Sequence, residues 1–266
     1  MKPRSIARLL ATLTGAAAML IAWAASAADV HVMLSSGFSE AYSVLAPAFE
    51  RASGHRLVTT RGPSMGDSPE AIPTRIKRGE PVDVVIMVGA SIDELDRQGL
   101  LSAASKVDLA RSQIGMVVRT GAAKPDIGSV EAFRRTLLEA KSIAYSDSAS
   151  GTYLSTTLFA RLGVADQVAA KSRKIKGPPS GEPVAAVVAR GESEIGFQQV
   201  SELLHVPGVL FVGPIPTELQ QDTFFSAAIA TAVMQPEAAG ALIRFLASPE
   251  AAPAISKSGL APLFGR

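Results

Sequence analysis

A short apolar segment that leads into a loop rich in Ser and Gly, followed by a helical pattern, occurs three times in this chain. The three loops are Ser35–Gly37, Ser64–Ser68 and Ser146–Gly151. A short apolar run that ends at such a loop is typical of a buried strand, and a helix after the loop is typical of a strand–helix–strand unit. The sequence therefore predicts an α/β fold with mostly parallel sheets.

The same loops have the composition of anion-binding sites. A helix N-terminus presents backbone N–H groups that lack intrahelical partners, and Ser hydroxyls add further donors. In open α/β sheets, ligands bind beyond the carboxyl ends of the strands, which is where these loops lie. The loop residues that we expect to contact a small anionic ligand are Ser35, Ser36, Gly37, Ser64, Met65, Gly66, Ser148, Ser150, Gly151 and Tyr153.

Residues 1–27 have the pattern of a secretory signal peptide. Three basic residues precede an apolar stretch over residues 9–22, and Ala25-Ser26-Ala27 is a small-residue cleavage site. We expect cleavage near Ala27 and a periplasmic product. A membrane anchor is the alternative, although polar residues interrupt the apolar stretch and it is short for a membrane span.

The charge and the cysteine content of the mature chain exclude several function classes. Three of the 26 basic side chains and none of the 24 acidic ones lie in residues 1–27, so the mature chain has 23 basic and 24 acidic side chains. A nearly neutral chain gives no case for a nucleic-acid partner or an anionic membrane surface. The absence of Cys excludes thiolate nucleophiles and Cys-based metal sites, and the three His residues show no metal-ligand spacing. We expect no metal, no cofactor and a monomeric protein.

The order of the predicted elements divides the mature chain into two lobes. Apolar runs predict strands over residues 114–118 and 226–232, where the chain crosses between the lobes. We predict the first lobe over residues 28–112 and 226–266 and the second over residues 113–225, with a binding cleft between them. A ligand that touches all three loops would bridge the lobes and favour their closure.

Three features together carry a resemblance to a known family. They are the export signal, the segment Gly79-Glu80-Pro81-Val82-Asp83-Val84-Val85 after the first Ser loop, and Gly191-Glu192-Ser193-Glu194-Ile195-Gly196 before a strand of the second lobe. With them the chain resembles the periplasmic molybdate-binding protein family over nearly all of its mature length. The resemblance implies the type II periplasmic binding protein fold, in which two α/β lobes are joined by a hinge.

The chain departs from the pattern of that family at three places in the cleft. Gly37 stands where the family has a serine, and the second loop is enlarged to Pro63–Ser68. Gln198 and Gln199 follow the second-lobe strand, where the family has a tyrosine. We therefore expect a ligand other than molybdate or tungstate. Both glutamines are candidates to bind it, and one of them should face away because neighbouring strand residues point to opposite sides.

The three departing segments resemble a narrower group on the same scaffold, isomerases that interconvert cis- and trans-aconitate. The segments read PSMGDSPEAIP, YSDSASGTYLS and GFQQVSEL. The resemblance implies a base-mediated allylic proton shift, with N–H and O–H donors that stabilise the developing charge. One alternative is a non-enzymatic binding protein that delivers a tricarboxylate, another organic acid or an oxyanion to an ABC permease. A second alternative is a ligand sensor for a membrane receptor.

Asp67 and Asp147 are the candidate bases because each lies inside a cleft loop. A carboxylate in a dry cleft beside an anion has a raised pKa, which suits proton transfer near neutral pH. Both positions are also typical of Asx turns and helix caps, and that alternative stays open. Glu182 is a third candidate, in a segment that we expect to be an exposed loop.

Overall fold

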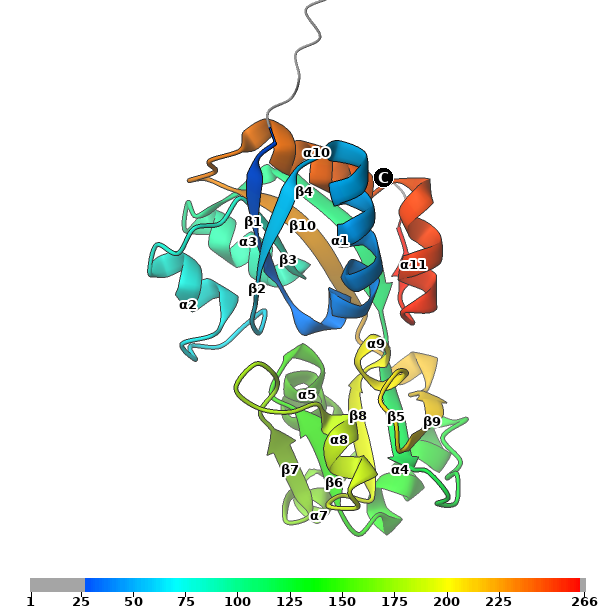
Figure 1. Cartoon of the computed structure of the whole chain (residues 1–266). Helices are drawn as coiled ribbons and strands as arrows, with labels where there is room; N and C mark the ends of the chain where they lie inside the picture. The colour runs from blue at the N-terminus through cyan, green and yellow to red at the C-terminus, as the bar shows by residue number, and fades with distance from the viewer. Residues whose placement is uncertain (1–26, 264–266) are drawn as a thin grey trace, which may run out of the picture.

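The computed structural model describes residues 27–263 and consists of two α/β lobes, one above the other in Figure 1. Except for Ala27, the signal peptide predicted over residues 1–27 lies outside the described residues. The first sheet has the strand order β11-β4-β10-β3-β1-β2, and the second has the order β7-β6-β8-β5-β9. Within residues 27–263, no helix has both the length and the apolar composition needed to cross a bilayer.

The first sheet is mixed. Its strands are β1 (Asp29–Leu34), β2 (Arg56–Arg61), β3 (Val84–Val88), β4 (Leu101–Ser112), β10 (Thr223–Ala230) and β11 (Ala261–Pro262). β1 lies between β2 and β3 and is parallel to both, as predicted, whereas β10 is antiparallel to β3 and β4. The antiparallel part exists because β4 carries the chain out of this sheet and β10 brings it back.

Helices cover both faces of the first sheet, so the lobe has three layers. They are α1 (Ser39–Ser53), α2 (Ile72–Lys77), α3 (Gly89–Arg97), α10 (Pro236–Leu246) and α11 (Ala252–Lys257), with 3-10 turns η1 (Ser36–Phe38) and η4 (Pro249–Ala251). One core cluster lies under α1, α10 and α11, and another lies under α2 and α3. α2 starts at Ile72 because Pro73 fits the first turn, where a missing N–H has no intrahelical partner to lose.

The second lobe repeats this layered arrangement. Its strands are β5 (Ile114–Arg119), β6 (Ile143–Ser146), β7 (Ser172–Ile175), β8 (Ile195–Gln199) and β9 (Val209–Pro214). Its helical segments are α4 (Val130–Glu139), α5 (Ala149–Tyr153), η2 (Leu154–Leu158), α6 (Phe159–Arg161), α7 (Ala165–Ala169), α8 (Val184–Ala189), α9 (Val200–Leu203) and η3 (Thr217–Leu219). β6 is parallel to β7 and β8, and β5 is antiparallel to β8 and β9.

Two crossovers join the lobes. Gln113 links β4 to β5, and a second segment leads from η3 to β10, where Thr223 pairs with Ser112. Residues 223–225 thus belong to the first sheet, although the predicted boundary placed them in the second lobe, because Phe225 is buried in the first-lobe core. The Gln220 side chain ties the crossovers together, since its amide donates to the Ile114 carbonyl and accepts from the Ile114 N–H, each at 2.9 Å.

Candidate functional site

A pocket lies between the lobes, beyond the carboxyl ends of β1, β3, β6 and β8. Its volume is about 470 Å³, part of it open to solvent. The predicted site residues that line it are Ser35, Ser36, Gly37, Ser64, Asp147, Ser148, Gln198 and Gln199. The pocket therefore brings together residues of all three Ser/Gly loops and of the Gln-Gln segment.

Hydrogen bonds hold the first-lobe hydroxyls of the pocket in position. The Ser64 hydroxyl donates to Ser35 Oγ at 2.8 Å and accepts from the Val88 N–H at 3.1 Å. The Ser35 N–H donates to the Ile86 carbonyl at 2.8 Å. Both serines are buried, so the ends of β1, β2 and β3 are joined through two side chains that also face the ligand space.

The aromatic ring of Phe225, on β10, occupies the space that a serine side chain at position 37 would fill. A Cβ on Gly37 would lie 2.0 Å from Cζ of Phe225, which also lines the pocket and is 2% exposed. From the second lobe, the Ser201 hydroxyl donates to the Gly37 carbonyl at 2.8 Å. The two lobes are thus in direct contact at this side of the pocket.

The third loop is packed tightly at the start of α5. Ser146 Oγ is hydrogen-bonded to the hydroxyls of Ser148 at 2.8 Å and Ser150 at 3.0 Å. A Cβ on Gly151 would lie 1.7 Å from the Ser146 carbonyl oxygen, so only glycine lets α5 begin this close to the end of β6. Ser146 lines the pocket, although it was not among the predicted contacts.

Asp147 is half-buried in the pocket wall. Its Oδ1 accepts a hydrogen bond from the Gly177 N–H at 3.1 Å. Gly177 and Pro178 belong to the loop before α8 and line the pocket as well. The Asp147 side chain therefore connects two loops of the second lobe.

Both glutamines at the end of β8 line the pocket. The Gln198 amide accepts from the Val184 N–H at 3.1 Å and donates to Glu202 Oε1 at 2.8 Å. The Gln199 amide accepts from the Ser112 hydroxyl at 2.6 Å and donates to Thr223 Oγ1 at 3.1 Å, so it binds the strands on both crossovers. The side chains do leave β8 on different sides. Both nevertheless line the pocket, so which of them contacts a ligand stays a prediction.

Glu202, on α9, is the titratable residue of this pocket that was not predicted from the sequence. It is half-buried, lines the pocket and accepts the hydrogen bond from Gln198. Burial raises the pKa of its carboxyl to about 7, and the charge of Asp147 acts in the same direction, while the Gln198 hydrogen bond opposes both. None of the described residues that line the pocket is Lys or Arg.

Five predicted contacts lie outside the pocket, one of which is Gly151 at the start of α5. Met65, Ser150 and Tyr153 line an adjoining hollow of the cleft, and the Tyr153 hydroxyl donates to the Leu219 carbonyl at 2.9 Å. Gly66 has a φ of 90° at the turn of the second loop and is exposed. Asp67 follows it, is exposed as well, and lines neither space. The two predicted bases are therefore not brought together.

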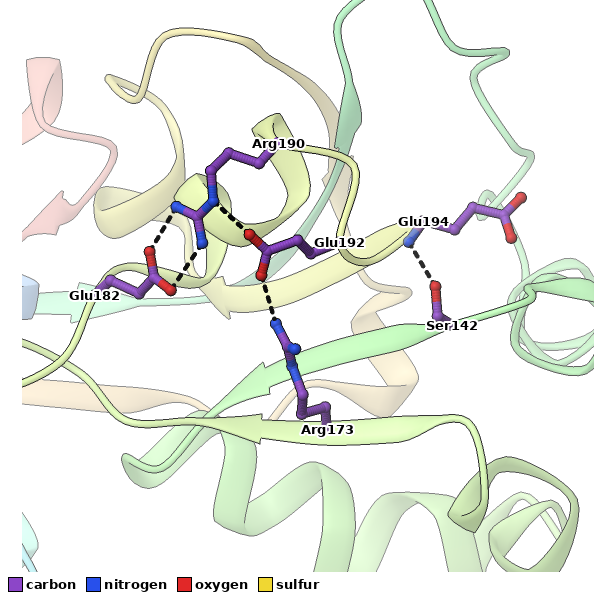
Figure 2. A network of polar contacts seen from close by, with 6 residues as sticks. All are labelled: Ser142, Arg173, Glu182, Arg190, Glu192 and Glu194. Carbon is purple, nitrogen blue, oxygen red and sulfur yellow. Dashed lines mark hydrogen bonds and ion pairs between the residues drawn. The ribbon is translucent and has the colours of Figure 1, made fainter.

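Glu182 is held in an ion-pair network on the surface of the second lobe, shown in Figure 2. Arg190 donates to both Glu182 oxygens, at 2.7 and 2.9 Å, and to Glu192 at 2.6 Å. Arg173 donates to Glu192 at 3.2 Å. The Arg190 hydrogen bonds lower the pKa of Glu182 below its usual value, so this carboxylate is a weak base that anchors the loop before α8.

Comparisons with known proteins agree on the scaffold. A family model described as bacterial extracellular solute-binding protein matches residues 30–261. The chain is 50% identical over 232 residues to an aconitate isomerase of Pseudomonas sp., covering 87% of each sequence. It is 29% identical over 263 residues to the molybdate-binding protein ModA of Azotobacter vinelandii, covering 96% of this chain and 97% of that protein.

Solved structures show the same fold. The periplasmic molybdate-binding protein of Azotobacter vinelandii has a TM-score of 0.69 at 21% identity, with 87% of this chain and 98% of that chain covered. The sulfate-binding protein SubI of Mycobacterium tuberculosis has a TM-score of 0.69 at 16% identity, with 89% and 87% covered. The predicted periplasmic binding protein fold and the resemblance to molybdate-binding proteins are confirmed.

Proposed function

Because the chain belongs to the bacterial extracellular solute-binding protein family, we propose that it uses the interlobe pocket of that scaffold to interconvert cis- and trans-aconitate. The observation that carries this proposal is the 50% identity to an aconitate isomerase over most of both chains. The pocket supports it, since hydroxyl and amide donors surround two carboxylates. Proton transfer next to a bound polycarboxylate needs both kinds of group.

The isomerisation is a proton shift between the two end carbons of the allylic system. A pocket carboxylate removes a proton from the methylene carbon, and the electron pair spreads over the allylic carbons onto a substrate carboxylate. Hydroxyls of Ser35 and Ser36 from the first lobe and Ser148 from the second donate to the substrate carboxylates, together with the second N–H of each glutamine amide, while Ser64 holds Ser35 in place. Asp147 and Glu202 are the carboxylates that line this pocket and are available for the proton.

We place the reaction in the periplasm, with residues 1–27 removed on export and a monomer as the active form. A solute-binding protein that delivers a tricarboxylate or another small anion to an ABC permease is the second candidate function. It is favoured by one observation, the family model that covers residues 30–261. A pocket with neutral donors and no cationic side chain would bind an anion for either function. A measurement of turnover therefore distinguishes the isomerase from the transport protein.

Mature protein incubated with cis-aconitate is expected to form trans-aconitate much faster than a protein-free control does. The product is measured by chromatography. The reverse reaction should reach the same equilibrium ratio, because a catalyst does not change it. Calorimetry on the same preparation measures binding of cis-aconitate, citrate and molybdate. Tight binding of an anion without turnover would reject the isomerase and leave the transport protein.

A further inference from the structure

A second cavity adjoins the pocket and meets it at Glu202. Its volume is about 580 Å³, part of it open to solvent. The residues that line both spaces are Ser36, Pro178, Gln198 and Glu202. Glu202 is the one titratable residue of these four, so a single carboxyl group borders both the ligand space and a second space that is itself partly open to solvent.

The groups around Glu202 are acidic or neutral in both spaces. Asp147 faces it from the loop after β6, and Gln198 donates to it from β8. In the second cavity, Glu40 of α1 and His205 after α9 are the other titratable lining residues, and both are exposed to solvent. Among the described residues that line the two spaces there is no Lys or Arg.

We propose that Glu202 is the proton carrier of the isomerisation, and that the second cavity is the route by which its proton exchanges with bulk water while substrate fills the pocket. This inference rests on the proposed function, since it names the residue that performs the proton shift. The position of Glu202 between the two spaces supports it. Asp147 has the other role, as the neighbouring carboxylate whose charge increases the proton affinity of Glu202.

The step balances with one carrier. The C–H bond of the methylene carbon breaks, its proton goes to the Glu202 carboxylate, and its electron pair enters the allylic system. The same carboxyl then protonates the opposite end carbon, which takes back the electron pair as the new C–H bond forms. Nothing is oxidised or reduced, and the carboxylate is restored. Exchange with water through the second cavity replaces the carried proton between the two transfers.

The raised pKa of Glu202, about 7, suits this role. A carrier is most effective when its pKa is close to the working pH, because it must both take and give a proton. We expect kcat/KM to fall about tenfold for each pH unit below 7, as the carboxylate becomes protonated, and to level off above pH 7. Asp147→Asn removes a negative charge beside Glu202, so the fall in kcat/KM of this variant on acidification should begin at a lower pH than in the wild type.

The test is isomerisation of cis-aconitate in D₂O by the full mature protein, with deuterium in the product located by NMR. The wild type is expected to place solvent deuterium in the new methylene group of trans-aconitate. Glu202→Gln keeps the size and the hydrogen-bonding capacity of the side chain but has no basic carboxylate, and we expect its kcat to be about 10²- to 10⁴-fold lower. Glu218→Gln, the same change at an exposed position outside both spaces, is the matched control and should retain full activity. Thermal unfolding of each variant checks that the fold is kept.

Each result has one meaning. A Glu202→Gln protein that isomerises within tenfold of the wild type would overturn the assignment of the carrier and leave the proposed function standing. Products from D₂O that keep protium would overturn the exchange route, because the proton would then pass from carbon to carbon without meeting water. A wild type that neither isomerises cis-aconitate nor exchanges its methylene protons would reject the proposed function, and the inference with it.

Discussion

Asp83→Ala is expected to lower the free energy of unfolding by about 3–5 kcal/mol, because three backbone N–H groups lose the carboxylate that they share. Asp83 is fully buried at the start of β3. Its Oδ2 accepts from the His31 N–H at 2.8 Å, and its Oδ1 accepts from the N–H groups of Met234 and Gln235 at 2.7 and 3.0 Å. One carboxylate therefore joins β1, β3 and the turn that leads into α10.

The cost arises from the groups that are left behind. Alanine provides no acceptor, so three partly buried backbone N–H groups lose their partner, and a donor left unpaired away from water costs about 1–3 kcal/mol. Asp83→Asn keeps the volume but points an NH₂ group at one set of these donors. We expect it to fall between the wild type and Asp83→Ala. The measurement is urea unfolding followed by circular dichroism at pH 7.

Asp29→Ala serves as the control for this prediction. Asp29 lies on β1, two residues before His31, and pairs with Arg56 on the exposed surface. Exposed ion pairs contribute little to stability, so this substitution should leave the unfolding midpoint nearly unchanged. If Asp83→Ala cost less than about 1 kcal/mol, the carboxylate would not be the link between the three elements, and the strands would be held by their ladder hydrogen bonds alone.

The fold was predictable where local pattern and tertiary environment agree. The runs before the first and third Ser/Gly loops, which form β1 and β6, are apolar because helices cover both faces of each sheet, and such runs predict strands. β4 was missed. Its residues Ser102–Asp108 are polar or only partly buried, and they extend because β10 pairs with them. No local pattern predicts a strand whose extended conformation is imposed by pairing partners more than a hundred residues away in the sequence.

The site divides in the same way. The Ser/Gly loops follow predicted strands, so their meeting in one pocket follows from the topology of parallel strands. Glu202 stood inside the segment GFQQVSEL, but its significance depends on burial and on Asp147, which is distant in sequence. Asp67 was a candidate base because it lies inside a predicted cleft loop, yet the turn at Gly66 leaves that carboxylate exposed. A loop composition identifies the neighbourhood of a site and not the direction of each side chain.

Gly37→Ser is the second substitution with a large expected effect. It restores the side chain that molybdate-binding relatives are expected to have, and by composition alone it would be harmless. Its Cβ would meet the Phe225 ring at 2.0 Å, with two further ring carbons at 2.8 Å. The ring is buried and must move within the pocket wall. We expect a stability loss of about 1–3 kcal/mol, typical of overpacking, and a fall in kcat/KM of about 100-fold from displaced substrate.

A double variant separates this clash from any effect of the serine hydroxyl. The atoms that a Cβ would strike are the three outermost carbons of the Phe225 ring, and leucine lacks all of them. Gly37→Ser combined with Phe225→Leu should therefore be more stable than Gly37→Ser alone, although Phe225→Leu by itself removes buried apolar volume and destabilises. A favourable coupling energy from the four unfolding curves would show that the two positions share one space. Losses that simply add would mean that the Phe225 ring does not limit position 37.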